Sequence, residues 1–362
     1  MDDENKLYRE LQLFLDRETL GFPETPSGSD TRLLKALFTP QQAKAVMHLT
    51  YKFSNLDEIY GRTGNGEFTR EEVESILDGC AKQGLIAYKK QDGVKYYRTI
   101  HYLLGMAEGG LHGGKPKPEF LSAMVEYAKD GLFWKAFLKT KVSQMRTIPI
   151  EESLSNQKHV ATFDKVKEIV LNSEGPFVIY ECACRKGARM AAHPCKRTSR
   201  RETCMSLGKA AESIVEFGKG REISREEALD ILEKNQEEGL VLQPSNTQTA
   251  DFICSCCGCC CGIFRLHKSL PNPVDYWTTN YYAEVDPEIC TACGTCVDIC
   301  NVAAIKLQED ENVAKVNIKR CLGCGNCVSR CPVEAIALVK KELEFVPPFT
   351  GEDLNEVIMT NK

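Results

Sequence analysis

The chain has 362 residues, of which 43% are hydrophobic and 27% are charged, and its formal net charge is −5. This composition is typical of a globular protein with two or three domains, and the mild charge disfavours a nucleic-acid coat protein. No run of about 18 apolar residues is present, which excludes a membrane-spanning helix, and the N-terminus MDDENKLYRELQ lacks a secretory signal. We therefore expect a cytoplasmic protein. In that compartment, the 19 cysteines favour metal ligation over disulfides.

Three helices followed by a hairpin are predicted in the N-terminal third. Thr39 with Gln42, and Thr69 with Glu72, form capping boxes ahead of the first and third of these helices. The segment LIAYKKQDGVKYYRTI alternates around an Asp-Gly pair, which is a hairpin signal. This order of elements predicts a winged-helix-like domain.

The charges of this domain argue against DNA binding. The predicted recognition helix, residues 69–84, carries four acidic residues and two basic ones. Phosphate contacts supply much of the energy of DNA binding, so an acidic helix fits the major groove poorly. The hairpin is basic and suits phosphate or an acidic protein. We expect a role in protein interaction or structure, and we expect Cys80, on the apolar face of the helix, to pack in the core.

Four cysteines follow a glycine-rich segment and a helical stretch at about 118–140. They occur within residues 180–204 with the pattern C-x-C-x10-C-x8-C and are Cys182, Cys184, Cys195 and Cys204. The segment FVIYECAC resembles a short buried strand, which would direct the first two thiols to the same face. An amphipathic helix is predicted from Met205 to near Gly218, and a second helix starts at Ser224 with a capping-box pattern. This helical excursion is expected to bring the four cysteines close to the next group.

The next group occupies the stretch CSCCGCCCG at residues 254–262. Its members are Cys254, Cys256, Cys257, Cys259, Cys260 and Cys261. Small residues between them allow the backbone to approach a metal centre closely. Adjacent cysteines form strained disulfides, so ligation is expected here, and an oxidised-thiol sensor is the alternative.

Two runs near the C-terminus, CTACGTCVDIC at 290–300 and CLGCGNCVSRCP at 321–332, each have the spacing C-x2-C-x2-C-x3-C. This spacing resembles that of two-cluster bacterial ferredoxins, in which the fourth cysteine of each run ligates the other [4Fe–4S] cluster. The resemblance implies one cluster on Cys290, Cys293, Cys296 and Cys331, and a second on Cys321, Cys324, Cys327 and Cys300. Asn301 departs from the pattern, because Cys331 is followed by proline and Cys300 is not. Two structural zinc sites are the alternative.

The upstream cysteines are then expected to hold one or two further clusters, three or four in total. The preferred division places one cluster on the 182–204 group and a fourth on four of the six cysteines in 254–261. Three consecutive thiols point to different sides of the backbone and do not easily serve one cubane. A mixed partition of the two groups, and one cluster with a zinc ion, remain open. The loop 181–204 has seven basic and two acidic residues, which would offset a cluster's negative charge or dock an acidic partner.

The whole chain resembles 4Fe–4S dicluster-domain iron–sulfur proteins of anaerobic prokaryotes that have a winged-helix-like N-terminus. The resemblance implies an α+β multidomain plan and no particular activity. We expect five parts: a winged-helix-like domain with an N-terminal helix (1–115), a helical connector (116–160), a cysteine-rich helical Fe–S module (161–280), a ferredoxin-like dicluster domain (281–342) and a tail (343–362).

The leading functional hypothesis is an electron-transfer protein that resembles a polyferredoxin subunit. It would relay single electrons to or from a partner oxidoreductase, with redox proteins as partners and neither membrane nor DNA among them. The sequence contains no Rossmann fingerprint, P-loop or convincing catalytic triad. One alternative is a low-potential reductase with its active site in the 182–204/254–261 cysteine module. The other is a redox-responsive transcription regulator.

Overall fold

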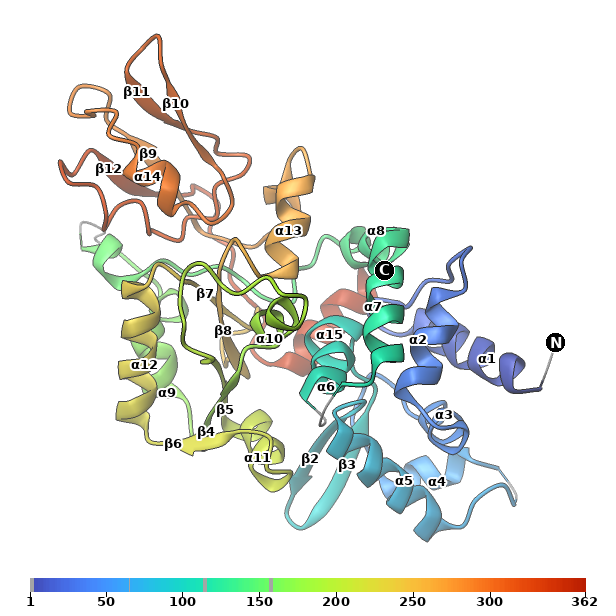
Figure 1. Cartoon of the computed structure of the whole chain (residues 1–362). Coiled ribbons are helices and arrows are strands. Elements are labelled where there is room, and N and C mark those ends of the chain that lie inside the picture. The colour runs from blue at the N-terminus through green and yellow to red at the C-terminus, as the bar shows by residue number, and fades with distance from the viewer. Residues whose placement is uncertain (1–2, 65, 113–115, 156–158) are drawn as a thin grey trace. The chain divides into compact units, whose positions relative to one another are not determined.

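The computed structural model describes residues 3–64, 66–112, 116–155 and 159–362 (Figure 1). The chain combines helices and short strands, as predicted. It divides into two compact units: unit 1 comprises Met1–Thr140 with Asn355–Lys362, and unit 2 comprises Lys141–Leu354. The boundary between the units falls inside the connector predicted for 116–160. Within the described ranges, no helix has both the length and the apolar character needed to cross a bilayer.

Unit 1 is mostly helical. Its helices are α1 (Asp3–Arg17), α2 (Ser29–Leu37), α3 (Pro40–Val46), α4 (Leu56–Arg62), α5 (Arg70–Gln83), α6 (Ala107–His112), α7 (Pro118–Asp130), α8 (Leu132–Lys139) and most of α15 (Gly351–Thr360), with a kinked turn η1 (Tyr102–Met106). The strands β1 (Ser54–Asn55), β2 (Ala87–Gln91) and β3 (Val94–Arg98) pair antiparallel in the order β1-β3-β2.

Local sequence signals account for the start of several of these elements. Both capping boxes predicted for this unit are present, before α3 and before α5. The hairpin between β2 and β3 turns at Asp92 and Gly93, which both have positive φ, as a type I′ turn requires. Cys80 is fully buried on α5, and burial raises the pKa of its thiol to about 12. Its predicted role in core packing is confirmed.

Unit 2 contains the metal-ligand motifs. Its helices and short helical turns are η2 (Glu151–Leu154), η3 (Thr162–Asp164), α9 (Val166–Asn172), α10 (Ala183–Met190), α11 (Gly208–Glu216), α12 (Arg225–Glu237), α13 (Gly262–Ser269), η4 (Pro273–Tyr276) and α14 (Thr295–Ile299). Its strands are β4 (Phe177–Glu181), β5 (Glu202–Leu207), β6 (Arg221–Ile223), β7 (Val241–Pro244), β8 (Phe252–Cys256), β9 (Tyr281–Val285), β10 (Ile305–Gln308), β11 (Val313–Val316) and β12 (Ile336–Lys340).

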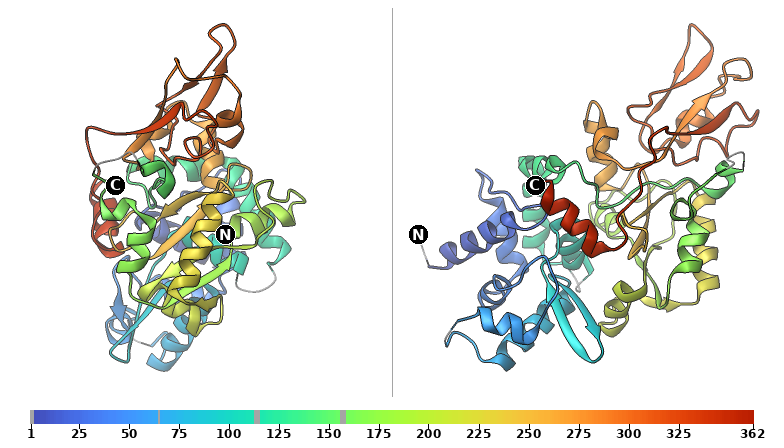
Figure 2. Two further views of the ribbon diagram at one scale, coloured as in Figure 1. Left: turned by 90° about the vertical axis from the view of Figure 1, so that its left-hand side faces the viewer. Right: turned by 180° about the vertical axis from the view of Figure 1, so that it is seen from behind.

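A five-stranded antiparallel sheet in the order β6-β4-β5-β8-β7 organises the cysteine-rich part. Side chains alternate between its two faces. One face supplies Ile179, Met205 and Ile253 to a core with α9 and α12, and these two helices lie along that side of the sheet in Figures 1 and 2. The positions next to these core residues, Cys204 and Cys254, therefore belong to the opposite face. The sheet thus separates an apolar core from a thiol-bearing side.

Two local predictions for this part were wrong. The predicted strand FVIYECAC ends at Glu181, and Cys182 is instead the N-cap of α10. Residues 205–207 pair with their neighbours as part of β5, so the predicted amphipathic helix begins only at Gly208. In both places, pairing with distant strands decides where the strand ends and the helix begins.

The C-terminal part of unit 2 is an internal repeat. β9 pairs with β12 and β10 pairs with β11, both antiparallel. Corresponding positions in the two cysteine runs have nearly equal backbone angles: φ is 53° at Ala292 and 60° at Gly323, and it is 81° at Gly294 and 79° at Gly325. The two runs therefore wrap their loops in the same way.

Candidate metal centres

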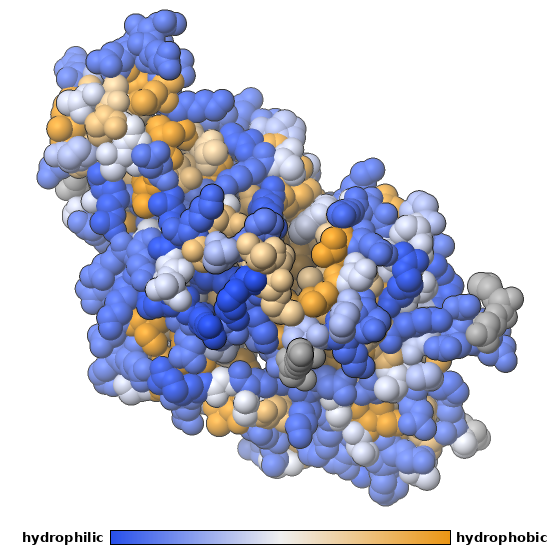
Figure 3. Space-filling model, in the orientation of Figure 1, coloured by the Kyte–Doolittle hydropathy of each residue, from blue (hydrophilic) through white to orange (hydrophobic). Residues whose placement is uncertain are grey.

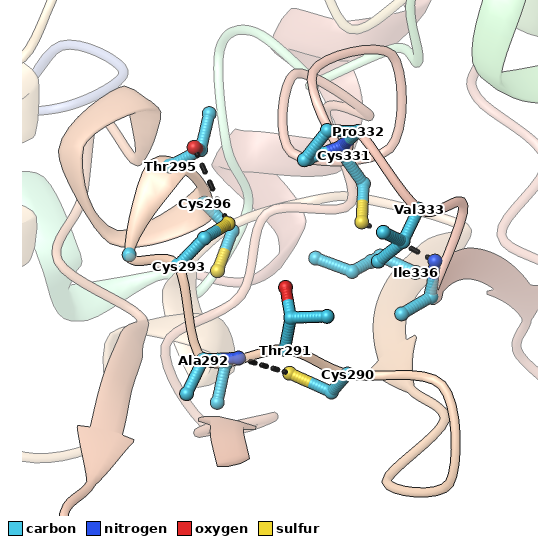
Figure 4. A pocket seen from close by; sticks show the side chains of 13 residues that line it. Cys290, Thr291, Ala292, Cys293, Thr295, Cys296, Cys331, Pro332, Val333 and Ile336 are labelled. Atoms are coloured by element: carbon cyan, nitrogen blue, oxygen red, sulfur yellow. Dashed lines mark hydrogen bonds between the residues drawn. The ribbon is translucent and has the colours of Figure 1, made fainter. Parts of the chain in front are cut away.

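The first C-terminal site is a pocket lined by the four cysteines that the crossed pattern assigns together: Cys290, Cys293, Cys296 and Cys331. The pocket encloses about 310 Å³, including the part open to solvent. Figure 4 shows the sulfur atoms of these residues facing a common space between the 290–296 loop and the segment that carries Cys331. The structure thus brings together thiols that are about 40 residues apart in the chain.

The second C-terminal site comprises the other crossed set. The thiols of Cys300, Cys321 and Cys324 interact electrostatically with one another and with Cys327. Burial raises the pKa of Cys324 to about 12. A buried thiol of this kind loses its proton on binding a metal, because the metal replaces the proton as its positive partner.

Backbone amides at both sites donate to the sulfurs. The N–H of Ala304 lies 3.2 Å from the Cys300 sulfur, and the N–H of Ala335 lies 3.2 Å from the Cys331 sulfur, at corresponding positions of the repeat. The Cys321 sulfur accepts from Ala283 and Gly323. Such bonds favour the thiolate and help to set the reduction potential of a cluster. This donor set, together with the pocket, fits a pair of [4Fe–4S] clusters.

The two C-terminal sites differ in their exposure. Cys293 is exposed and hydrogen-bonds with Thr295, which lowers the pKa of its thiol. In the second set Cys321 and Cys327 are buried, as Cys296 is in the first, and Cys300 and Cys324 are half-buried, so no cysteine of the second set is exposed. Apolar side chains are also exposed on this part of the chain, among them Ile289 and Ile318, and Figure 3 shows hydrophobic residues among hydrophilic ones on its visible face at the upper left. The first site is therefore the one nearer to solvent.

Six upstream thiols lie near one another in a closed ring, in which each thiol perturbs the pKa of its neighbours; this set is here called the six-thiol ring. In order around the ring they are Cys182, Cys184, Cys261, Cys256, Cys254 and Cys204. Cys204 and Cys254 come from the adjacent strands β5 and β8. Cys182 and Cys261 are the N-caps of α10 and α13, so the positive ends of two helix dipoles lie at the ring.

The remaining four thiols form a separate compact set, here called the four-thiol group. Its members are Cys195, Cys257, Cys259 and Cys260, and their sulfur atoms all lie within 4.8 Å of one another. Burial acts to raise the pKa of Cys195, but hydrogen bonds from the backbone of Thr198 and Arg197 and from Arg185 outweigh it and lower that pKa to about 6. The closeness of the four sulfur atoms suits the group to hold one positive ion.

The structure groups these ten cysteines differently from the preferred division by sequence. Cys195 lies with residues of the CSCCGCCCG stretch and not with Cys182, Cys184 and Cys204. The stretch itself is split, because three of its thiols join the ring and three join the four-thiol group. This is a mixed partition of the two sequence groups.

Arg185 connects the two thiol sets and was not singled out by the sequence. Its side chain is 4% exposed and donates to the hydroxyl of Thr203 and to the carbonyl of Ser255. Burial alone would lower its pKa, but the negative charges of Cys182, Cys204 and Cys257 outweigh burial and raise it. Arg185 is thus a permanently charged, buried cation beside both sets. Other basic residues of the predicted loop are paired, such as Arg200 with Glu238 at 2.6 Å.

The cysteine-rich part and the C-terminal repeat are joined by specific polar contacts. The Asn301 carboxamide oxygen accepts from the backbone N–H of Gly258 at 2.9 Å, and its nitrogen donates to the Gly239 carbonyl at 2.8 Å. Asn326 donates to the same carbonyl at 3.0 Å. The backbone N–H of Ile150 donates to the carbonyl of Cys324 at 3.0 Å. Asn301, which departs from the ferredoxin pattern and directly follows Cys300, therefore links the ferredoxin domain to the middle of the CSCCGCCCG stretch.

Comparison with known proteins identifies one region. Residues 289–335 match the family model of the 4Fe–4S dicluster domain. Searches among curated proteins and among solved structures gave no match for the chain. The matched range contains all eight cysteines of the two C-terminal sites, which the geometry also brings into two sets. The C-terminal part of this chain is therefore a ferredoxin-type 4Fe–4S dicluster domain.

Proposed function

We propose that this protein is an iron–sulfur electron-transfer protein that relays single electrons between a partner oxidoreductase and its own cysteine-rich module. The bound [4Fe–4S] clusters would supply one-electron chemistry at each site. Cys290, Cys293, Cys296 and Cys331 would hold the outer cluster, and Cys300, Cys321, Cys324 and Cys327 the inner one.

The difference in exposure between the two ferredoxin sites carries this proposal. An exposed outer site, marked by Cys293, offers short access to an external protein. None of the four cysteines of the inner site is exposed, and this site is in contact with the cysteine-rich part through the Asn301–Gly258 hydrogen bond. One site open to solvent and a second, less exposed site that adjoins the cysteine-rich part form an arrangement that suits an electron relay.

The six-thiol ring would hold a third cluster. Its thiols lie close enough to perturb one another's pKa values, and Arg185 and two helix N-termini provide positive charge beside it. Positive charge near a cluster stabilises the reduced, more negative state and raises the reduction potential. The ring is therefore proposed as a site that accepts electrons readily.

The proposed transfer of electrons between the outer site and an external protein can be tested by removing a ligand of that site. Protein prepared without oxygen is reduced with dithionite, and electron transfer to an added acceptor protein, such as cytochrome c, is followed by stopped flow. The Cys293→Ala variant should transfer electrons much more slowly, while EPR still detects the other clusters. The matched control is Cys80→Ala, which removes a buried thiol far from both motifs in the sequence and should transfer at the wild-type rate. Transfer at the wild-type rate by Cys293→Ala would show that the outer site does not pass electrons to the external protein, and a chain without iron would refute the function itself.

A reductase is a second candidate, favoured by the size of the ring. Six thiols are more than the four that a cubane uses, and Cys184 and Cys254 are only half-buried. Two spare thiols beside a cluster could carry out dithiol chemistry on a disulfide substrate. Alkylation of the cluster-loaded protein with iodoacetamide, read out by peptide mass, would favour this candidate if two ring cysteines are modified.

For unit 1 we propose a winged-helix arrangement used for protein docking. The basic hairpin residue Lys95 is paired with two acidic residues of α5, Glu74 at 2.9 Å and Asp78 at 2.7 Å. Its charge is thus neutralised within the unit and is withdrawn from phosphate binding. This pairing favours a protein partner over DNA.

A further inference from the structure

The four-thiol group has sulfur separations that are much shorter than those of a cluster site. The Cys195 sulfur lies 3.6 Å from that of Cys257 and 3.7 Å from that of Cys259. The Cys259 sulfur lies 3.5 Å from that of Cys257 and 3.7 Å from that of Cys260. The other two separations in the group do not exceed 4.8 Å, so the four sulfurs surround one small space.

These separations have the size of a single-metal site. Zinc–sulfur bonds of about 2.3 Å in a tetrahedron place the sulfurs about 3.8 Å apart. A [4Fe–4S] cubane inserts four irons between the thiolates, each of which is bonded outside its own iron corner, so the sulfurs are separated by more than about 6 Å. The observed values of 3.5 to 3.7 Å agree with the first geometry and leave no room for the second.

The ferredoxin domain provides an internal comparison. Its two four-cysteine sets have the spacing and the family match of cubane ligands. Among the described residues, the four-thiol group is the set of cysteines whose sulfurs all lie within 4.8 Å, and neither ferredoxin set meets this limit. The same structure thus distinguishes open sets of thiols from one closed set.

We infer that Cys195, Cys257, Cys259 and Cys260 bind one tetrahedrally coordinated zinc ion and not an iron–sulfur cluster. Four cysteine ligands with no open position are typical of structural zinc, and such closed sites stabilise folds. Four thiolates exceed the charge of Zn²⁺, and the buried Arg185 beside Cys195 offsets part of the excess. The backbone N–H of Lys196 also donates to the Cys259 sulfur at 3.4 Å, as an outer-shell contact that orients a ligand.

The position of the site gives the zinc ion a structural task. It ties the 191–201 loop, through Cys195, to the turn that carries the other three ligands. Gly258 lies within that turn, and its backbone N–H donates to the side-chain oxygen of Asn301 in the ferredoxin domain. Lys268 donates to the carbonyl of the same glycine at 2.9 Å. Zinc would therefore hold rigid the surface against which the ferredoxin domain packs, and the ten upstream cysteines would serve one zinc ion and one cluster.

Metal analysis of the full chain tests this assignment. Protein purified without oxygen should contain about one zinc ion per chain, together with the iron and sulfide of the cluster sites. The Cys259→Ser variant should lose the zinc and keep its iron, sulfide and EPR signals. The matched comparison is Cys254→Ser in the ring, which should keep the zinc. Wild-type protein without zinc would overturn the assignment. A Cys259→Ser variant that loses iron would show that these cysteines bind an iron–sulfur cluster instead.

A second measurement does not depend on any variant folding. Zinc K-edge X-ray absorption of the wild-type protein should show four sulfur neighbours at about 2.3 Å and no iron neighbour. Nitrogen or oxygen neighbours at the zinc would overturn the four-cysteine site. Zinc and iron are measured separately. A protein without zinc would contradict the zinc site only, and a protein without iron would contradict the proposed electron transfer.

Discussion

Replacing Gly258 with alanine should weaken the contact between the cysteine-rich part and the ferredoxin domain. A Cβ atom on Gly258 would lie 2.2 Å from the Asn301 carbonyl oxygen and 3.0 Å from its carbon, so backbone atoms must move. Overpacking of this kind costs about 1–3 kcal/mol, and loss of the hydrogen bond from Gly258 to Asn301 adds about 1 kcal/mol. The expected destabilisation is about 2–4 kcal/mol.

Gly262 provides the matched control in the same stretch. A Cβ atom there meets nothing within 4 Å, and the residue is the first of α13. Alanine at this position should be neutral or should stabilise by up to about 1 kcal/mol, because it restricts the unfolded chain. The close approach of the Asn301 backbone is present at Gly258 and absent at Gly262.

The assay is urea unfolding without oxygen, followed by circular dichroism and by the visible absorbance of the clusters. Gly258→Ala should lower the urea midpoint and expose the segment between the two parts to limited proteolysis, whereas Gly262→Ala should keep or slightly raise the midpoint and leave the proteolysis unchanged. Equal midpoints for the two variants would refute the reasoning, because the packing of Asn301 on Gly258 would then contribute nothing to stability.

Three further predictions concern charge, pH and nucleic acid. Arg185→Met should shift the reduction potential of a ring cluster to more negative values, by on the order of 1 kcal/mol or about 40 mV, since a buried positive charge is lost. Arg185→Lys should keep the wild-type potential in the same EPR titration, and equal potentials for both variants would contradict the role of the charge. Burial and the charge of Arg320 lower the pKa of His267 from 6.5 to about 3. Between these two pH values His267 is neutral in the folded chain and protonated in the unfolded chain. The free energy of unfolding should therefore fall by about 1.4 kcal/mol between pH 7.5 and pH 5.5. Urea unfolding at the two pH values should show this loss in the wild type and not in His267→Phe. An equal loss in the variant would show that other groups cause it. Unit 1 should not bind DNA tightly at physiological salt, because α5 is acidic and pairs with Lys95 of the hairpin. Nanomolar binding in a random-oligonucleotide selection would contradict this and favour a transcription regulator.

Local signals in the sequence were sufficient wherever a few neighbouring residues decide the structure. The capping boxes at Thr39 and Thr69 act within one helical turn, and the Asp92-Gly93 turn needs only two residues with positive φ. The ferredoxin runs also belong to this class, because a loop around a cluster is set by cysteine spacing and by small residues at fixed offsets. The sequence likewise showed that Asn301 departs from the repeat.

The sequence alone determined that this is a metal-binding chain with a C-terminal dicluster ferredoxin domain, since spacing within a short loop specifies those ligands. The grouping of the ten upstream thiols was decided only by the tertiary structure. Cys204 and Cys254 become neighbours because β5 pairs with β8, and Cys195 reaches Cys257 because the loop after α10 folds back over the turn before α13. Strands that are distant in the chain decide by their pairing which thiols lie together. The spacing of the ten cysteines in the sequence does not specify this grouping, because all ten are chemically alike.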